Sequence, residues 1–469
     1  MRTSSKRLTC AIRPAYFAVV VAVVVVAWMC VFTLVYNNTF QALHRPRFGY
    51  STPPPWTATV SNITHTTFQP TLTGQNHSIR ERASVHKPAS VDGRSPFVSG
   101  TTSSYCKLPT PDGVVLPRNT QYLEQCSSSS PTISVPAAGK KKKVILVYNR
   151  PSWMMITDSG DKTFKRCGLE DACIMTNDRR TLHTADAVFI NAQHLNFPYP
   201  FEAVTNSTRR RPPQQMWVAF SIEPPPLMPQ SVRGWENVFN WTMTYRRDSD
   251  IFVPYGKLSL RTEAALPARN FTQLALNKTK PVAWFVSNCV TQSAREAYVK
   301  ELSKYIQVDV YGKCGKLSCV QKDRDCSGML SSTYFFYLSF ENSLCVDYVT
   351  EKLFNLYGSA DVIPVTRGGV KYDEVFPANT LINTANFKSP RHLANHLHDL
   401  MGDLQTYTAM LRAKHRFMLR KNELHEQLGH GFCKLCRMLH DGDRTQARRV
   451  YPDFRHWVHK NACLRPKDL

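Results

Sequence analysis

The sequence lacks both of the common glycine-rich phosphate-binding patterns, GxGxxG and GxxxxGK[ST], and it shows no internal repeat. Without these glycine-rich patterns, the chain has neither the usual dinucleotide-binding fingerprint nor a P-loop. Their absence also disfavours a sulfotransferase that uses a nucleotide 3′-phosphate. At 469 residues, the chain is longer than one hydrophobic core usually organises, so we expect two domains with appendages.

Charge is absent from residues 15–36, a 22-residue apolar run. At about 1.5 Å per residue this run covers a hydrocarbon core of roughly 30 Å, and it is longer than the apolar part of a cleaved signal peptide. Four basic residues and no acidic one precede it. The positive-inside rule therefore predicts a cytoplasmic tail (1–14), a transmembrane signal anchor (15–36) and a lumenal or extracellular remainder.

The residues after this run fit the secretory pathway. Twelve of the 14 cysteines lie there, where disulfides persist. Residues 37–139 are rich in Ser, Thr and Pro and are predicted to form a glycosylated stem. The predicted glycosylation sites are the sequons at Asn37, Asn62, Asn76, Asn206, Asn240, Asn270 and Asn277.

Acidic residues are scarce, 35 against 59 basic ones, which gives a net charge of +24. A lumenal protein does not meet genomic DNA, so nucleic acid is not expected as a partner. The excess fits anionic small molecules such as nucleotide diphosphates, or acidic membrane and matrix surfaces. The runs at 140–143 and 209–211 are equally typical of solvated surface.

Two α/β blocks follow the stem, at 140–279 and 280–437, with a C-terminal extension at 438–469. Short apolar runs alternate with amphipathic stretches, which predicts doubly wound α/β domains with a ligand cleft between them. The predicted strands are 144–149, 185–192, 216–222, 282–288, 308–312, 334–340 and 361–366, and the predicted helices are 294–306 and 347–360.

The stretch ENSLCVDYVTEKLF, residues 341–354, directly follows a buried-type strand. As a helix capped by Asp347, it separates an apolar stripe from a face that carries Tyr348, Glu351 and Lys352. A helix N-terminus at the carboxyl end of a strand favours a diphosphate, a lysine adds charge, and a carboxylate accepts from sugar hydroxyls. The alternative is a solvated helix start without a special role.

A second strand end has the same topology. Ser287 and Asn288 close the strand and Arg295 lies just inside the next helix, where all three are placed to converge on phosphates. Glu223 ends a third apolar strand before three prolines, which is a position for a general base or only for a solvent-facing carboxylate.

The pattern Asp248-Ser-Asp250 resembles the DxD metal motif, but Arg246 and Arg247 can equally neutralise it within a structural ion-pair cluster. The CxxC pair Cys433 and Cys436, with Cys463 beyond, favours structural disulfides over zinc, because no second pair follows. The spacings Cys167/Cys173 and Cys314/Cys319/Cys326 suggest short-range bridges.

The segments FNWTMTYRRDSDIFVPYG, VAWFVSNC and FYLSFENSLCVDYVTEKL together resemble the α1,3-fucosyltransferase family of the Golgi, over residues 144–437. The resemblance implies a GT-B architecture, with two Rossmann-like domains facing across a cleft and GDP-fucose held by the C-terminal one. It also implies inversion at the fucose anomeric carbon and a single-pass type II Golgi membrane location. It favours the structural interpretation of the DxD pattern and implies no obligatory metal, leaving stimulation by Mn²⁺ or Mg²⁺ open.

The resemblance assigns roles residue by residue. Glu223 matches the general base, although the segment reads IEPPP where the family pattern has serine after the glutamate. Cys289 and Cys345 also lie inside the two donor motifs, and the sequence leaves open whether one or both are free thiols or disulfide-bonded. The residues implied in binding GDP-fucose are Ser287, Asn288, Arg295, Asn342, Tyr348, Glu351 and Lys352.

The expected reaction is transfer of L-fucose from GDP-fucose in α1,3 linkage to GlcNAc of a glycoprotein or glycolipid glycan. The acceptor stays open between the core GlcNAc of N-glycans, toward which VSNC leans, and N-acetyllactosamine antennae. The alternative from another class is a catalytically inactive, membrane-tethered glycan-binding protein of the same fold.

Overall fold

The computed structural model describes residues 121–123, 141–151, 153–154, 161–194, 211–228, 235–261, 268–319, 326–419, 423–441 and 450–468. The predicted tail and membrane anchor lie outside these residues, as do nearly all of the stem and the sequons at Asn37, Asn62, Asn76 and Asn206. Within the described part of the chain, no helix has the length and apolar character that crossing a membrane requires.

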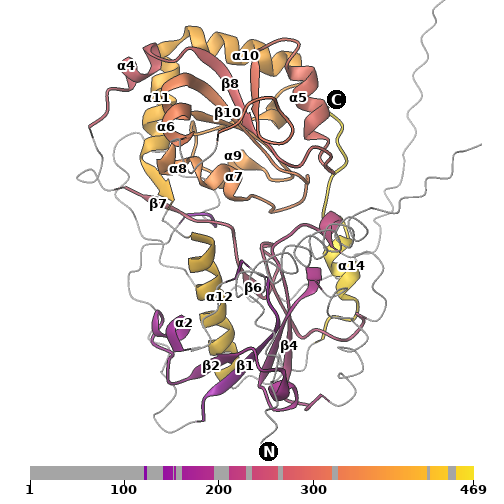
Figure 1. Ribbon diagram of the computed structural model, residues 1–469. Helices are drawn as coiled ribbons and strands as arrows, with labels where there is room; N and C mark the ends of the chain where they lie inside the picture. Colours follow the sequence, from indigo (N-terminus) through magenta and orange to yellow (C-terminus); the bar gives the residue numbers. More distant parts are fainter. Residues whose placement is uncertain are drawn as a thin grey trace, which may run out of the picture. The chain divides into compact units, whose positions relative to one another are not determined.

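The first α/β domain contains a six-stranded sheet in the order β2-β1-β3-β4-β5-β6 (Figure 1). Every neighbouring pair is parallel, so the strands need crossover connections rather than hairpins. The three strands predicted in this block are present as β1, β3 and β4. The strands are β1 (Lys143–Asn149), β2 (Cys173–Thr176), β3 (Ala187–Asn191), β4 (Met216–Ser221), β5 (Trp241–Thr244) and β6 (Ile251–Phe252).

The second domain contains a five-stranded sheet in the order β12-β11-β10-β8-β9, again with parallel pairs throughout. The strands predicted from 282 to 366 are all present. They are β8 (Lys280–Phe285), β9 (Val308–Tyr311), β10 (Tyr334–Phe340) and β11 (Ile363–Arg367), and the fifth strand, β12 (Ile382–Asn383), was not predicted. In both sheets the order reverses once, between β1 and β3 and between β8 and β10. Such switch points are where open α/β sheets bind ligands.

Helices complete the layers of the two domains. The α-helices are α2 (Asp161–Lys165), α4 (Phe271–Leu276), α5 (Arg295–Leu302), α6 (Cys326–Thr333), α7 (Glu351–Phe354), α8 (Leu356–Ser359), α9 (Tyr372–Val375), α10 (Pro390–Gly402), α11 (Leu404–His415), α12 (Glu423–His440) and α14 (Phe454–His459). The 3₁₀ helices are η1 (Arg179–His183), η2 (Ala192–His194), η3 (Pro225–Leu227) and η5 (Thr384–Asn386).

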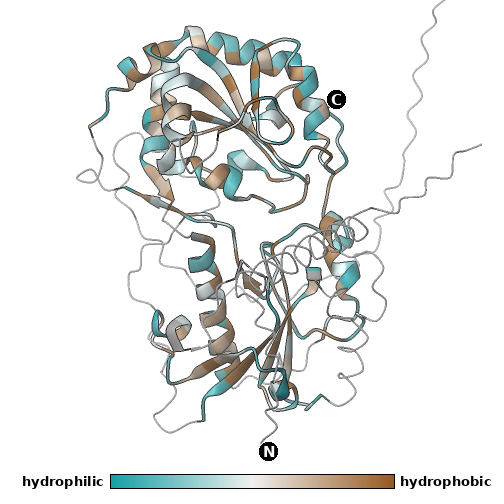
Figure 2. Ribbon diagram, viewed as in Figure 1, coloured by the Kyte–Doolittle hydropathy of each residue, from teal (hydrophilic) through white to brown (hydrophobic). Residues whose placement is uncertain are grey.

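Buried strands are apolar on both faces, as parallel sheets between helices require. In β8, Val282 and Trp284 pack with α5, α10 and α11, while Ala283 faces the opposite core around Tyr337. Figure 2 shows the same arrangement as brown strands between helices that turn their teal sides outward. Alternation along one strand therefore builds two separate cores.

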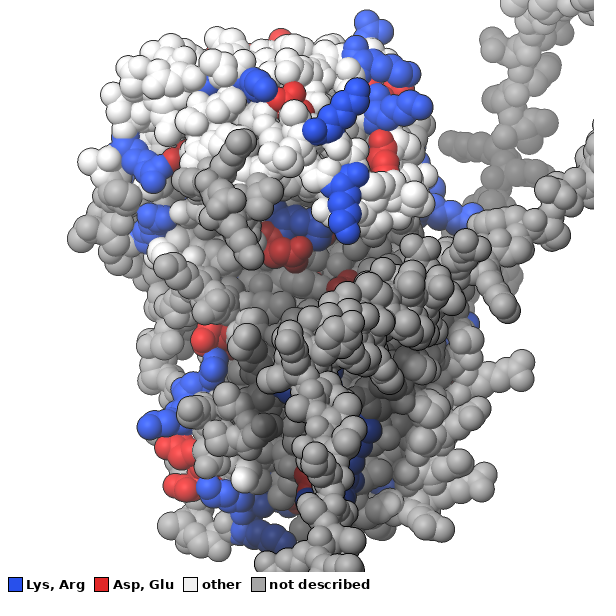
Figure 3. Space-filling view, in the orientation of Figure 1, with Lys and Arg blue, Asp and Glu red and all other residues white. Residues whose placement is uncertain are grey.

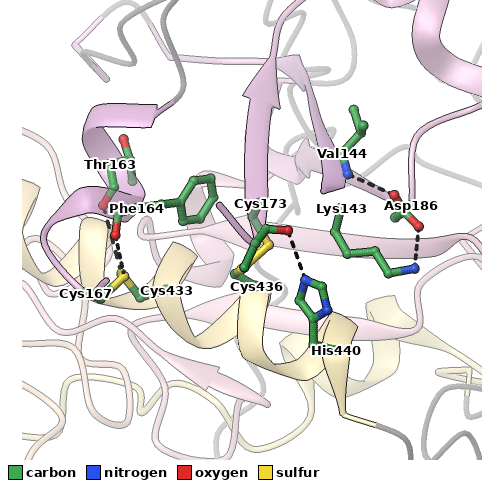
Figure 4. The surroundings of a disulfide bond; sticks show 11 residues. Lys143, Val144, Thr163, Phe164, Cys167, Cys173, Asp186, Cys433, Cys436 and His440 are labelled. Atoms are coloured by element: carbon green, nitrogen blue, oxygen red, sulfur yellow. Dashed lines mark hydrogen bonds and ion pairs between the residues drawn. A yellow bond between two sulfur atoms is a disulfide. The ribbon is translucent and has the colours of Figure 1, made fainter. Parts of the chain in front are cut away.

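The chain returns to the first domain after the second. Helix α12 packs Phe432 and Leu435 into the core of the first sheet, and disulfides Cys167–Cys433 and Cys173–Cys436 fix it there (Figure 4). Helix α14 packs on the other face of this sheet, where Phe454 contacts Phe239. The domain boundary predicted at 437 is therefore misplaced, because α12 belongs to the first domain.

Where the chain passes from the first domain to the second and back, two short strands pair antiparallel. Strand β7 (Leu258–Leu260) lies on the way out and β13 (Phe417–Leu419) on the way back, with Ser259 opposite Met418. The two crossings are thereby tied to each other.

The disulfides confirm part of the cysteine analysis and correct the rest. Cys433, Cys436 and Cys463 are disulfide-bonded, as predicted, and Cys319 pairs with Cys326. Cys167 and Cys173 do not form a local bridge, since each reaches α12. Neither Cys289 nor Cys345 is a free thiol, because Cys289 pairs with Cys314 and Cys345 with Cys463.

Candidate functional site

The two predicted donor motifs lie side by side at the carboxyl edge of the second sheet. Strands β8 and β10 pair in parallel at its switch point, so the segments that follow them start from the same edge. Ser287 and Asn288 follow β8 and are exposed, whereas Asn342 follows β10 and is partly buried. The fold therefore brings the two sequence motifs together.

Arg295 connects these two strand ends by hydrogen bonds to main-chain carbonyls on both. Its side chain is buried, with Nη1 donating to the Phe340 carbonyl at 2.7 Å and Nη2 to the Asn288 carbonyl at 3.2 Å. Burial lowers the pKa of the guanidinium. Its Nε is buried and has no hydrogen-bond partner among the described residues. The structure gives Arg295 a positioning role, and its contact with a phosphate stays a prediction.

Glu341, directly after β10, organises the loop that leads to α7. Its fully buried carboxylate accepts from the main-chain N–H of Thr350 at 2.9 Å and from the Thr350 hydroxyl at 2.9 and 3.0 Å. Burial raises the pKa of Glu341. The ammonium of Lys352 lies 3.4 Å from this carboxylate and donates to the Thr350 hydroxyl at 2.8 Å.

The electrostatics of Lys352 follow from these neighbours. Burial alone would lower its pKa, but the carboxylates of Glu341 and Glu351 outweigh burial and raise it. Glu351 itself is exposed beside the ammonium, 3.1 Å away. The cation is thus held charged between two carboxylates at the rim of the sheet.

The helix expected from Asp347 begins later. Asp347 has φ +61°, in the left-handed region, and the N-cap is Thr350, whose hydroxyl accepts from the Lys352 N–H. Helix α7 has four residues, so its dipole adds less to an anion site than the predicted helix would. The apolar stripe is nevertheless buried as expected, at Val349, Leu353, Leu356 and Ala360.

The side-chain carbonyl of Asn342 is a candidate acceptor for a ligand. Its Oδ1 is buried and has no hydrogen-bond partner among the residues that the structure describes. An unsatisfied buried carbonyl of this kind is costly unless a ligand hydroxyl or amide occupies the place. A hydroxyl-rich ligand at this edge of the sheet fits that requirement.

Glu223 from the first domain meets the donor motif of the second. Its Oε2 accepts from the Tyr348 hydroxyl at 3.3 Å. Burial raises the pKa of Glu223, and the hydrogen bond from Tyr348 partly opposes that rise. The Tyr348 ring packs edge-on against Tyr245 and Tyr255, and the Tyr255 hydroxyl donates to the Ile222 carbonyl at 2.8 Å. A partly buried carboxylate with a raised pKa thus faces the donor motif.

The C-terminal tail is fastened across the same edge. The Cys345–Cys463 disulfide is flanked by main-chain hydrogen bonds from Val346 to Ala462 and from Leu464 to Leu344, each 2.7 Å. Farther along, Arg367 forms a two-point pair with Asp468, in which Nε and Nη2 donate to the two carboxylate oxygens at 2.8 and 2.6 Å. The tail therefore holds the loop that contains Cys345.

The DxD pattern is engaged in structural contacts. Asp248 pairs with Arg246 at 2.6 Å, and one Asp250 oxygen accepts from the Thr242 N–H and hydroxyl and from the Tyr451 hydroxyl. Among the described residues, the one cluster with metal-ligand geometry is Cys173, Cys436 and His440. Its two sulfurs form a disulfide, and the imidazole contacts the Ala172 carbonyl at 2.9 Å (Figure 4), so it does not offer thiolates.

Three predicted glycosylation sites lie within the described residues. Asn270 and Asn277 are exposed at the two ends of α4, and glycans there stay a prediction. Asn240 is 3% exposed, and its Oδ1 accepts from the Trp217 N–H at 2.8 Å. This burial disfavours a glycan at Asn240 in the folded chain, and the assignment stays a prediction.

Several residues of the site were not predicted individually. Glu341 carries a recognisable signal, since it is the first polar residue after an apolar strand. Asp347 is buried and binds the Arg247 side chain at 2.7 Å, although the two are 100 positions apart. Tyr245 and Tyr255 resemble ordinary core residues in the sequence.

On the face shown in Figure 3, basic side chains gather over the second domain with acidic ones among them.

Two family models match the chain, one described as fucosyltransferase, N-terminal, over residues 140–256 and one as glycosyltransferase family 10 (fucosyltransferase) C-term over residues 275–457. The chain is 37% identical over 294 residues to Alpha-(1,3)-fucosyltransferase C of Drosophila melanogaster, covering 59% of this chain and 66%, just under two thirds, of that relative.

It is also 33% identical over 355 residues to the human 4-galactosyl-N-acetylglucosaminide 3-alpha-L-fucosyltransferase FUT6, covering 74% of this chain and 90% of the relative. A solved structure of an alpha1,3-fucosyltransferase with GDP-fucose matches 68% of this chain and 94% of its own at 16% identity, with a TM-score of 0.42. The family models and the alignment along most of the human relative show that this chain belongs to glycosyltransferase family 10, the fucosyltransferases.

Proposed function

We propose that the chain is an inverting glycosyltransferase that moves L-fucose from GDP-β-L-fucose, in α1,3 linkage, to GlcNAc of a glycan. Family membership supports the reaction class, and relatives named for α1,3- and 3-alpha-L-fucosyl transfer support the linkage. The observation that carries the proposal is the contact between Glu223 and Tyr348, which sets a carboxylate with a raised pKa against the donor motif.

The donor is assigned to the edge of the second sheet. Lys352 supplies positive charge for the diphosphate, and Asn342 and Glu351 offer acceptors for ribose or fucose hydroxyls. Ser287 and Asn288 lie exposed on the neighbouring loop. In this proposal the two domains form a GT-B pair and the acceptor enters from the Glu223 side.

The chemical step is a single displacement. Glu223 takes the proton from the acceptor hydroxyl while that oxygen attacks the anomeric carbon from the face opposite GDP. The bond from the anomeric carbon to the diphosphate oxygen breaks, GDP leaves with the electron pair, and Lys352 stabilises the charge that forms there. No metal ligand from the protein enters this scheme, and Mn²⁺ or Mg²⁺ stimulation stays open.

The location belongs to the same proposal. The charge-free run at 15–36, the basic residues before it and the disulfides after it support a type II, single-pass Golgi membrane protein with a lumenal catalytic region. Two acceptors remain candidates, the core GlcNAc of N-glycans and N-acetyllactosamine antennae.

The test is an assay of the full chain in detergent with GDP-fucose and with both acceptor types, the linkage being read by NMR. Glu223→Gln should lower the transfer rate at least about a hundredfold and leave GDP-fucose affinity unchanged. Glu236→Gln, an exposed carboxylate of the same domain, is the matched control. Donor binding by the wild type without transfer to any acceptor would instead indicate the inactive glycan-binding protein.

A further inference from the structure

A polar cavity lies beside β7 and β13, the strands at which the chain crosses between the domains. Its volume is about 400 Å³, and three cationic side chains, Arg261, Arg269 and Lys414, line it together with serines. Arg261 directly follows β7, and its main-chain N–H donates to the Arg416 carbonyl next to β13 at 2.8 Å. The cavity is therefore attached to the ladder that ties the two crossings.

The cavity lies at the opposite edge of the second sheet from the donor motifs. Asp361 and the serines Ser331 and Ser332 line it, and these residues precede β11 and β10. The donor residues instead follow the strands. A strand of seven residues separates the two edges by roughly 20 Å. The cavity and the donor site share none of their residues.

Two lysines, Lys278 and Lys414, are buried at this edge. Lys414 Nζ donates to the Leu356 and Ala360 carbonyls at 2.6 and 2.7 Å, and Lys278 Nζ donates to the Tyr334 and Asp361 carbonyls at 2.8 Å. Burial lowers the pKa of each to about 7, and neighbouring cations contribute. Carbonyl dipoles hold both ammonium groups without supplying a counter-charge.

Cations outnumber carboxylates among the cavity residues that the structure describes. Among the described lining residues the one carboxylate is Asp361, and it pairs with Arg269. Arg261 has no carboxylate partner in the described part of the chain, and its Nε is buried without a hydrogen bond there. Gly358, at φ +92°, keeps the wall open beside the Arg261 guanidinium, since a Cβ would lie 3.2 Å from Nη2.

We infer that this cavity binds a tetrahedral, multiply charged oxyanion, a phosphate or sulfate group. A guanidinium, an ammonium and hydroxyls are the donors that such groups use, and an anion would neutralise the excess positive charge. The volume admits the free ion or an ester of it on a sugar. Because Arg261 and Lys414 adjoin β7 and β13, an occupied cavity stabilises the crossing between the domains.

The experiment compares inorganic phosphate and N-acetylglucosamine 6-sulfate with chloride at constant ionic strength, on the full chain. Phosphate should raise the midpoint of thermal unfolding by about 2 °C or more. Hydrogen exchange should slow in peptides that cover 258–261 and 414–419, more than in the donor loop 341–352. Tighter binding of the sulfate ester than of phosphate would identify an esterified sugar as the ligand.

Arg261→Gln should weaken phosphate binding about tenfold, whereas Arg412→Gln, on an exposed part of α11, should not. Ser359→Asp places a carboxylate at the exposed rim and should abolish binding even if Arg261→Gln does not fold. Equal effects of phosphate and chloride, unchanged binding in Ser359→Asp, or protection confined to 341–352 would each overturn the inference.

Discussion

The carboxylate of Glu341 closes the donor loop by accepting two different hydrogens from Thr350, the main-chain N–H at 2.9 Å and the hydroxyl at 2.9 and 3.0 Å. The eight residues between them include Asn342 and Tyr348. One buried contact thus sets the geometry of the loop that carries these two proposed donor residues and leads directly to Glu351 and Lys352.

Glu341→Ala should destabilise the protein by about 3 kcal/mol, because it leaves the buried Thr350 donors without their acceptor and removes the buried one of the two carboxylates beside Lys352. Chemical denaturation of the wild type and variant measures the difference. Glu374→Gln, whose exposed carboxylate pairs with Lys371, should change stability by less than about 1 kcal/mol. Equal losses in the two variants would show that Glu341 does not organise the loop.

The hydrogen bond between Tyr348 and Glu223 predicts a shift in the pH profile of transfer. Burial raises the Glu223 pKa above its ordinary 4.5, and the Tyr348 hydrogen bond lowers it. A general base must be deprotonated, so kcat/KM should fall as pH falls through this pKa. In Tyr348→Phe the lowering contribution is lost, and the acidic limb should move to higher pH.

The control for this shift is Tyr305→Phe, a tyrosine on the surface of the second domain whose hydroxyl contacts Glu301. Its acidic limb should coincide with that of the wild type. A limb that stays in place or moves to lower pH in Tyr348→Phe would show that Glu223 is not the titrating base.

The sequence predicted four of the five strands of the second sheet and the common strand-to-helix topology of its two donor motifs. Apolar strand runs and the strand–helix alternation are local signals, and parallel strands bring their carboxyl ends to one edge. The return of α12 to the first domain was not predictable in this way. Its stabilising contacts, Cys167–Cys433 and Cys173–Cys436, span 266 and 263 positions, and spacing alone does not identify such pairs.

The start of α7 shows a second kind of limit. Asp347 is a reasonable N-cap by residue type, but its carboxylate is taken by Arg247, which lies on the other domain. The backbone at Asp347 is left-handed, and Thr350 becomes the cap instead. A tertiary ion pair therefore overrides the local capping preference.

Glycan mapping tests the burial of Asn240. The asparagine is 3% exposed and accepts the Trp217 N–H, so a folded chain that carries a glycan there would have to open the edge of β5. Peptide mapping after enzymatic glycan release in heavy-oxygen water should label Asn270 or Asn277 and leave Asn240 unlabelled. Label at Asn240 in active protein would contradict this packing.

The Cys345–Cys463 disulfide predicts that the C-terminal tail supports donor binding. Replacing both cysteines by serine frees a 118-residue loop and releases the tail from the donor loop, so both stability and affinity for GDP-fucose should fall. The loss of stability should reach about 2–4 kcal/mol, and KM for GDP-fucose should rise more than kcat falls. The matched variant is Cys319→Ser with Cys326→Ser, whose cysteines are 7 positions apart and outside the donor motifs. It should leave KM for GDP-fucose unchanged. If both double variants change KM equally, the tail acts only through global stability; if only the first does, it positions the residues around Cys345.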